Sequence, residues 1–165
     1  FADNSFDVAT MALVIAFVPD AQKAAAEMAR VVRSGGLVAS YMWDVPGGGL
    51  PSAHIAAALT SMGIKPTLPP NPDASRADRM QAMWHAAGLI EVETRPFRIS
   101  IGYSSFDDYW ATHSLPVGPS GQAIQRLNAV QKDDLRARLR VLLLAEADDP
   151  LSYEACANAV KGRVP

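Results

Sequence analysis

The side chains with the clearest chemical potential lie in one short segment, SSFDDYWATHS, at residues 104–114. Phe106, Tyr109, Trp110 and His113 are spaced i, i+3, i+4 and i+7, so a helix would place them on one face. Because imidazole titrates near neutral pH, His113 is the candidate general base. Tyr109 and Trp110 are candidates to line an apolar small-molecule pocket with it. A helix packed on a core gives the same spacing without any ligand, and we favour that interpretation for Phe106.

The other reactive side chains show no partner pattern. His54 and His85 lie on predicted helices and are expected to be surface or packing residues. Cys156 is the single cysteine, which excludes an internal disulfide and a multi-cysteine zinc site, and we expect it to be a small buried residue. No metal site is expected. The Gly47–Gly49 run lacks the third glycine and the acid-ended strand of a dinucleotide site, so we expect a plain loop.

Composition limits the class of protein. The chain has 165 residues, of which 49% are hydrophobic and 19% charged, as expected for one globular domain or a large piece of one. No apolar run approaches the ~20 residues of a membrane span. A net charge of −2 and the lack of a Lys/Arg cluster give no basic field for nucleic acid. We therefore expect a cytoplasmic protein without a membrane or nucleic-acid partner.

The first 43 residues predict a strand, a helix and a second strand. Residues 6–14 are apolar and rich in β-formers, which is typical of a strand buried on both faces. Asp20 can cap a helix over residues 20–33, and Gly35 can supply the left-handed residue that ends it. Residues 37–43 form a second buried strand, which ends at Trp43. This βαβ unit predicts an α/β fold. Because α/β sheets bind ligands at carboxyl strand ends, Trp43 is a candidate pocket wall, although a core tryptophan is equally consistent.

The middle of the chain predicts two helices joined by an irregular segment. An alanine-rich helix spans residues 52–62, and four prolines between residues 64 and 74 prevent regular structure. Ser75 and Asp78 form an S-x-x-D start for the next helix. The apolar stripe of that helix places Trp84 against the sheet.

The last third predicts two strands with helices between them. Residues 90–103 alternate as a long strand, with a bulge near Arg95-Pro96 that keeps one apolar face buried. Residues 105–113 and 122–146 read as helices, the second with a break near Gln131. Residues 151–157 form a closing strand.

Three stretches together resemble a known family. FADNSFDVATMALVIAFVPD (1–20) and EMARVVRSGGLVASYMWD (27–44) resemble the second half of a class I S-adenosylmethionine-dependent methyltransferase. The tail SYEACANAVKGRVP (152–165) is similar to the last strand of small-molecule members. Ser34 stands where the family usually has proline, and Ala16 where many members have a polar residue. The resemblance is best over residues 1–44.

The resemblance implies a Rossmann-like sheet in the order 3-2-1-4-5-7-6 with an antiparallel seventh strand. The four predicted strands would be the fourth to the seventh, so the sheet is partial and the first three strands would precede Phe1. Residues 1–165 would form the C-terminal part of one methyltransferase domain. Its sections would be a strand-helix-strand core (1–44), a loop with helices (45–89) and the terminal strands (90–165), with an inserted helical cap at 104–147.

The resemblance also implies an activity, the transfer of a methyl group from S-adenosyl-L-methionine to a small-molecule acceptor. Met11 and Ala12 would lie beside the methionine part of the cofactor. Trp43 and the Tyr109, Trp110 and His113 set would line the acceptor pocket. The isolated chain is expected to be inactive, and a non-catalytic binding or oligomerisation module, or a bare folding fragment, are the alternatives. The unpaired edge of the strand at residues 6–14 predicts self-association.

Overall fold

The chain folds into two compact units. The structure is a computed structural model, and it describes residues 1–144 and 149–165. The first unit contains Phe1–Leu50, Pro69–Arg98 and Cys156–Pro165, and the second contains Pro51–Leu68 and Ile99–Ala155. None of the helices in the described part is long and apolar enough to cross a membrane.

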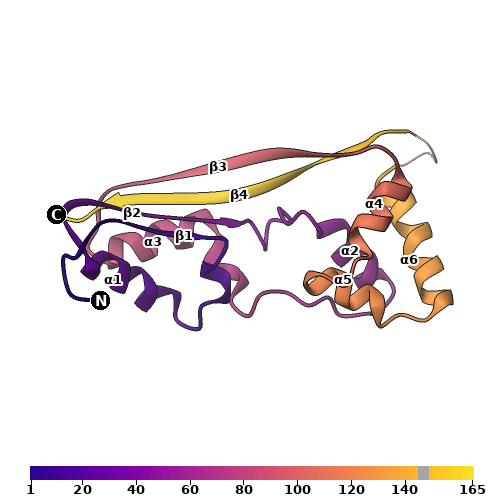
Figure 1. Cartoon of the computed structure of the whole chain (residues 1–165), viewed down its shortest axis with the longest axis horizontal. Coiled ribbons are helices and arrows are strands. Elements are labelled where there is room, and N and C mark those ends of the chain that lie inside the picture. Colours follow the sequence, from indigo (N-terminus) through magenta and orange to yellow (C-terminus); the bar gives the residue numbers. More distant parts are fainter. Residues whose placement is uncertain (145–148) are drawn as a thin grey trace. The chain divides into compact units, whose positions relative to one another are not determined.

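Four strands form one sheet in the order β1-β2-β4-β3 (Figure 1). The strands are β1 (Phe6–Ala12), β2 (Val32–Trp43), β3 (Ile90–Tyr103) and β4 (Leu151–Arg163). β1 pairs parallel with β2, and β4 pairs antiparallel with β2. This is the 4-5-7-6 order, with an antiparallel seventh strand, that the family resemblance implies, so the predicted partial α/β sheet is confirmed.

β1 differs from its prediction in length and in burial. It ends at Ala12, two residues early, because Leu13 has a left-handed backbone with φ of 57° and a 3-10 turn (Ile15–Phe17) follows. The strand was expected to be buried on both faces, but Val8 is 50% exposed. The reason is its place in the sheet: among the described strands β1 pairs with β2 alone and forms an edge.

α1 (Ala21–Val31) begins where the sequence predicts. The Asp20 carboxylate accepts a hydrogen bond from the Lys23 backbone N–H at 2.9 Å, which confirms the cap. Gly35 has the expected left-handed backbone, with φ of 75°, but it lies inside β2 rather than at the end of the helix. The helix stops at Val31 because Val32 already pairs with Phe6.

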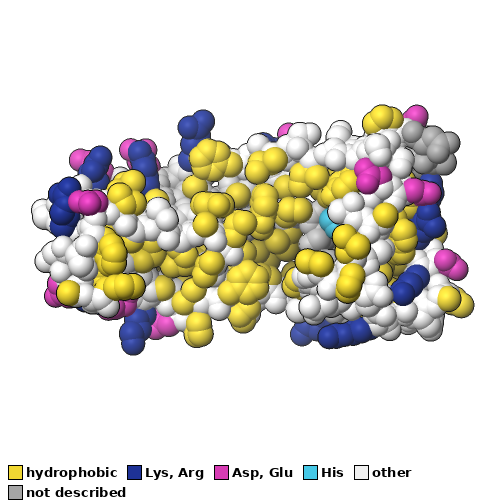
Figure 2. Space-filling model, viewed as in Figure 1, with side chains coloured by type: hydrophobic (Ala, Val, Ile, Leu, Met, Phe, Trp, Pro, Cys, Tyr) yellow, Lys and Arg dark blue, Asp and Glu magenta, His cyan; other side chains and the backbone are white. Residues whose placement is uncertain are grey.

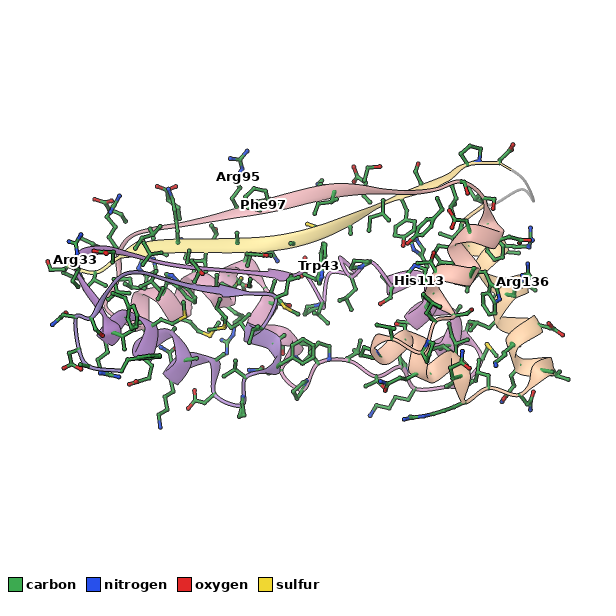
Figure 3. All side chains as sticks on the ribbon, viewed as in Figure 1. Arg33, Trp43, Arg95, Phe97, His113 and Arg136 are labelled. Atoms are coloured by element: carbon green, nitrogen blue, oxygen red, sulfur yellow. The ribbon has the colours of Figure 1, made fainter. Side chains whose placement is uncertain are left out.

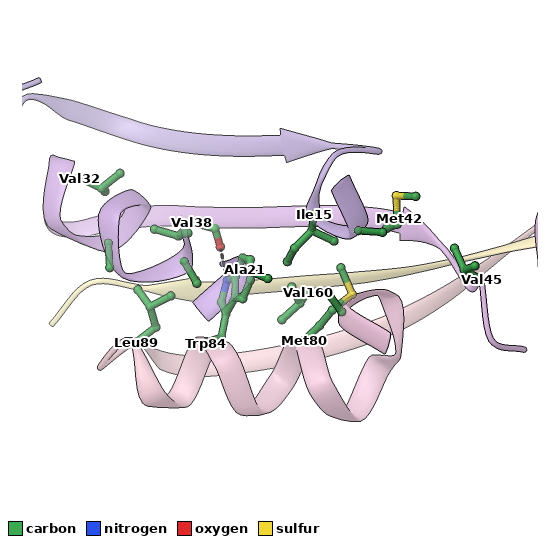
Figure 4. Packing of buried hydrophobic residues seen from close by; sticks show 14 residues of the cluster. Ile15, Ala21, Val32, Val38, Met42, Val45, Met80, Trp84, Leu89 and Val160 are labelled. Atoms are coloured by element: carbon green, nitrogen blue, oxygen red, sulfur yellow. Dashed lines mark hydrogen bonds between the residues drawn. The ribbon is translucent and has the colours of Figure 1, made fainter. Parts of the chain in front are cut away.

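α3 (Ala77–Ala86) packs against the sheet through Trp84, as predicted. The indole is fully buried, and its Nε1–H donates to the Val38 carbonyl of β2 at 3.0 Å (Figure 4). The predicted Ser75 cap is wrong. Ser75 ends a 3-10 turn (Pro72–Ser75), where its buried hydroxyl donates to the Pro72 carbonyl and accepts from the Val45 N–H.

The second unit is built around four helices. They are α2 (Ala53–Ser61), α4 (Phe106–His113), α5 (Gly118–Gln125) and α6 (Ala129–Leu142). The helical region predicted over residues 122–146, with a break near Gln131, is two helices, and the break lies at residues 126–128, because Asn128 and Gln131 form a capping box that starts α6. The predicted end of that helix at residue 146 lies outside the described residues. The buried core of the unit contains Ile55, Leu59, Phe106, Tyr109, Ile124, Leu135 and Leu139.

The two later strands also depart from expectation. β3 has the predicted bounds, but its apolar face is not buried: Phe97 is 46% and Ile99 is 47% exposed. β3 forms the other edge of the sheet. In Figure 3, Arg95 and Phe97 lie on the side of the sheet that faces away from α1 and α3. β4 is longer than predicted and continues to Arg163, because its antiparallel pairing with β2 extends to Leu37.

Candidate functional site

α4 holds two of the predicted pocket residues side by side. Ser105 caps the helix by accepting from the Asp108 N–H, as the helical interpretation of residues 105–113 requires. Phe106 and Tyr109 are fully buried in the second unit, and His113 is half-buried at the end of the helix. The ring centroids of Tyr109 and His113 are 4.5 Å apart, the outcome of their i, i+4 spacing.

His113, labelled in Figure 3, is hydrogen-bonded to two tyrosines from different strands. The distance from its Nε2 atom is 3.0 Å to the Tyr103 hydroxyl and 3.4 Å to the Tyr153 hydroxyl. Tyr153 in turn donates to the Pro51 carbonyl at 2.8 Å. The orientation of the imidazole is therefore set by hydrogen bonds from β3 and β4.

The rings extend this network into a cluster, which we call the Tyr–His cluster: Tyr103, Tyr109, Tyr153, His54 and His113. Tyr103 meets Tyr109 edge-on at 5.2 Å, and Tyr153 meets His54 edge-on at 4.8 Å between centroids. The Tyr109 hydroxyl and the Nδ1 atom of His54 are buried without a hydrogen-bond partner among the described residues. Such orphaned groups are uncommon in folded proteins.

Burial determines the protonation of this cluster. It lowers the pKa of His113, with a smaller contribution from nearby His54, and it lowers the pKa of His54 as well. Burial likewise raises the pKa of Tyr109 and of Tyr153. At neutral pH both imidazoles are therefore held neutral and both phenols remain protonated. A neutral imidazole is the form that can accept a proton.

His113 also lies in the wall of a groove of about 380 Å³ within the second unit. None of the described residues that line this groove carries a formal charge. They are Ser52, Thr112, His113, Leu115, Val117, Gly118, Pro119, Ser120 and Gly121.

The environment of Trp110 differs from that of Tyr109 and His113 on the same helix. It is half-buried, and the guanidinium carbon of Arg136 on α6 lies 5.9 Å from its ring centroid. Arg136 also donates to the Asp107 carboxylate at 2.6 Å. Trp110 therefore packs beside α6, and its place in a ligand pocket stays a prediction.

The predicted cofactor residues lie in the first unit. Met11 and Ala12 end β1, and the Ser40 hydroxyl donates to the Met11 carbonyl at 3.0 Å. Both line a groove of about 530 Å³ on the sheet. Its wall comes from all four strands: Thr10, Met11, Ala12, Ala39, Ser40, Tyr41, Glu93, Thr94, Arg95, Phe97, Ala159, Val160 and Lys161.

Trp43 is the last residue of β2 and pairs with Ala157 of β4. It is half-buried, at the carboxyl strand end where the sequence places it (Figure 3). Trp43 belongs to the first unit, whereas Tyr109, Trp110 and His113 belong to the second. Across the described residues no group of His, Cys, Asp and Glu side chains could hold a metal ion.

The sequence missed three members of the Tyr–His cluster. Tyr103 and Tyr153 occupy the two predicted strands that flank the helical insert, and His54 was expected to be a surface or packing residue. No local sequence pattern identifies these residues, because the hydrogen bonds of Tyr103 and Tyr153 to His113 span 10 and 40 residues of the chain. The one usable signal is that a tyrosine stands at the end of one flanking strand and near the start of the other.

Comparison with known proteins agrees with the family resemblance. Residues 1–40 match the family model of a methyltransferase domain. No curated protein sequence matches the chain. Among solved structures, a protein from Bacillus halodurans assigned as a methyltransferase is 16% identical with a TM-score of 0.52, and the match covers 100% of this chain and 67% of that one.

Two further solved structures are similar. The YcgJ protein of Bacillus subtilis is 20% identical with a TM-score of 0.52, and the match covers 99% of this chain and 65% of that one. A protein from Anabaena variabilis, assigned as a methyltransferase of an antibiotic biosynthesis pathway, is 15% identical with a TM-score of 0.55, with 98% and 68% covered. The chain thus spans about two thirds of these structures. The resemblance to class I S-adenosylmethionine-dependent methyltransferases, in sequence over residues 1–40 and in fold over the chain, is confirmed.

Proposed function

We propose that this chain is the part of a class I methyltransferase domain that carries its fourth to seventh strands, and that the complete domain transfers a methyl group from S-adenosylmethionine to a small molecule. The observation that carries the proposal is the strand order β1-β2-β4-β3 with parallel and antiparallel pairs as in that family. The methyltransferase match over residues 1–40 supports it.

The end of β1 is the proposed contact of this chain with the cofactor. Met11 and Ala12 would lie beside its methionine part, and the cofactor would supply an electrophilic methyl group on a sulfonium. Leu13 directly follows with a left-handed backbone, φ of 57°. Such backbone is costly for a branched side chain and concentrates at functional sites, which supports a ligand role for this strand end.

The second unit supplies the proposed acceptor wall. Tyr109 and His113 face each other within the Tyr–His cluster, and His113 is the proposed general base. Trp110 is the remaining proposed wall residue in this unit, whereas Trp43, the other predicted wall residue, belongs to the first unit. Much of the acceleration of methyl transfer can come from positioning and from exclusion of water, so these apolar side chains suit the reaction.

The proposal predicts that the 165-residue chain alone binds S-adenosylmethionine weakly or not at all. In the family the ribose hydroxyls are bound by an acid at the end of the second strand, and the methionine part lies against a glycine-rich turn after the first. Unpaired polar groups on a ligand forfeit affinity. Calorimetry should detect no binding with a micromolar dissociation constant. Micromolar binding to the chain alone would contradict the assignment of cofactor contacts to other strands.

A second candidate function is an assembly module, and the uncovered sheet favours it. β1 forms an edge without proline or lysine, and Val8 and Phe97 are about half exposed. Figure 2 shows apolar side chains gathered over the first unit. We infer that the isolated chain self-associates through the β1 edge.

Light scattering at several concentrations tests this association. The unmodified chain should show a mass of at least twice 17.6 kDa, and Thr10→Lys on β1 should return it to the monomer mass. Val130→Lys, at a residue 77% exposed on α6, is the matched control and should leave association unchanged. A monodisperse monomer of the unmodified chain at high concentration would refute the inference.

A further inference from the structure

The Tyr–His cluster joins four elements of the second unit. His113 lies on α4 and His54 on α2. The Nε2 atom of His113 lies 3.0 Å from the hydroxyl of Tyr103, which ends β3, and 3.4 Å from the hydroxyl of Tyr153 on β4. Tyr153 also meets the ring of His54, with the centroids 4.8 Å apart. Contacts between two helices and two strands of this unit therefore run through two imidazole rings.

No negative charge faces these rings among the described residues. The groups that face His113 are the phenols of Tyr103, Tyr109 and Tyr153 and the imidazole of His54. His54 in turn faces Tyr153 and His113. Because phenols are uncharged at and below neutral pH, they cannot act as counter-ions. An imidazolium ion at either position would therefore lack a partner of opposite charge.

The carboxylates closest in sequence are directed elsewhere. On α4, Asp107 accepts from Arg136, and Asp108 accepts from the Ser104 N–H and hydroxyl. Glu154 of β4 is exposed, and it lies on the opposite face of the strand from the cluster because side chains alternate along a strand. These acids therefore do not compensate a positive charge on the two imidazoles.

A proton on either ring is unfavourable in this environment. The Nδ1 atom of His54 is buried without a partner among the described residues, so an N–H there would have no acceptor. Burial lowers the pKa of both imidazoles, and the nearby His54 lowers the pKa of His113 further. In an opened unit the same rings meet water and take up protons below about pH 6.5.

We propose that the Tyr–His cluster is a pH-sensitive lock of the second unit: neutral His54 and His113 hold α2 and α4 against Tyr103 and Tyr153, and mild acid opens the unit by protonating both rings. The closed unit binds fewer protons than the open one, so its stability is complete above about pH 6.5 and falls as the pH drops toward the lowered pKa values. The lock uses neither cofactor nor acceptor, so it does not depend on the proposed methyltransferase function.

The first unit provides an internal reference. Its one histidine, His85 on α3, is exposed and meets water without any opening. The core of this unit is apolar and includes Trp84 and Met80 of the same helix. Mild acid should therefore act on the second unit and leave the first one folded.

Hydrogen–deuterium exchange of the whole chain, resolved by peptide and corrected for the intrinsic pH dependence of exchange, measures the opening of each unit. One proton taken up on opening raises the opening constant by at most about tenfold per pH unit. With two protons, the α2 and α4 amides should open more than about tenfold, and up to about a hundredfold, more at pH 5 than at pH 6. A rise of tenfold or less in the second unit, or an equal rise in α1 and α3, would overturn the proposal.

Variants assign the two protons. His113→Gln keeps a neutral hydrogen-bonding side chain, and His54→Phe keeps a ring against Tyr153. Each removes one imidazole, so each should reduce the rise to about tenfold or less. His85→Gln is the matched control and should keep the full rise. A full rise in His113→Gln or in His54→Phe would contradict the two-histidine lock.

Nuclear magnetic resonance of the unmodified chain with ¹⁵N-labelled histidine decides the matter if a variant does not fold. The ring signals of His54 and His113 should stay those of neutral imidazole at pH 6. They should become those of imidazolium only together with the loss of the native amide signals of α2 and α4. Imidazolium signals from a second unit that is still folded would overturn the proposal, because they would show that the closed cluster accepts the charge.

Discussion

Replacement of Trp84 by alanine is expected to lower the free energy of unfolding by about 3–5 kcal/mol, as truncation of a large core side chain does. The indole is fully buried, and its Nε1–H donates to the Val38 carbonyl at 3.0 Å. A Cβ atom built on Gly162 of β4 would lie 3.1 Å from the ring, so the ring fills the space that this glycine leaves. The variant loses that packing and the hydrogen bond together.

Urea unfolding, followed by circular dichroism, measures this difference. Trp84→Phe is the informative control, because it keeps most of the ring volume and removes the N–H donor, and it should lose about 1–2 kcal/mol. A loss below about 1 kcal/mol for Trp84→Ala would mean that α3 does not anchor the sheet as the structure shows it.

The elements that sequence reasoning predicted well are those that local chemistry specifies. The Asp20 cap depends on an N–H three residues away, and the burial of Trp84 follows from the period of its own helix. Each of these features is determined within one or two helical turns. The strand order came from the family resemblance and not from periodicity.

Burial of the strands could not be predicted, because it depends on what lies on each face. Val8 and Phe97 have the sequence pattern of covered strand residues, yet each is about half exposed. β1 and β3 are the two edges of the sheet. Apolar composition shows that a face suits burial, but it does not show which element covers it.

Tertiary hydrogen bonds explain the remaining differences at the site. Ser75 has the spacing of a helix cap, but its hydroxyl accepts a hydrogen bond from the Val45 N–H, 30 residues away in the chain. In the same way, Tyr109 and His113 meet through helical spacing, whereas Tyr153 reaches His113 across 40 residues. A local pattern can therefore predict the contact between Tyr109 and His113, but it cannot predict which other residues belong to the Tyr–His cluster.

The largest expected effect is a gain of cofactor binding when the sheet is completed. A chimera that fuses the first three strands of a class I methyltransferase before Phe1 would add a partner for the edge of β1. It would also supply the glycine-rich turn and the acid that bind the cofactor in that family. The end of β1, at Met11 and Ala12, would then lie beside the bound methionine part.

Calorimetric titration of S-adenosylmethionine into this chimera tests the central claim most directly. A chimera with a single cooperative unfolding transition should bind with a micromolar dissociation constant. Met11→Asp should weaken binding about tenfold or more, because it places a carboxylate at the methionine contact, and Val141→Asp, at a residue 74% exposed on α6, should leave it unchanged. Absence of binding to a folded chimera, or equal effects of the two aspartate variants, would contradict the assignment of this chain to the fourth to seventh strands of a methyltransferase.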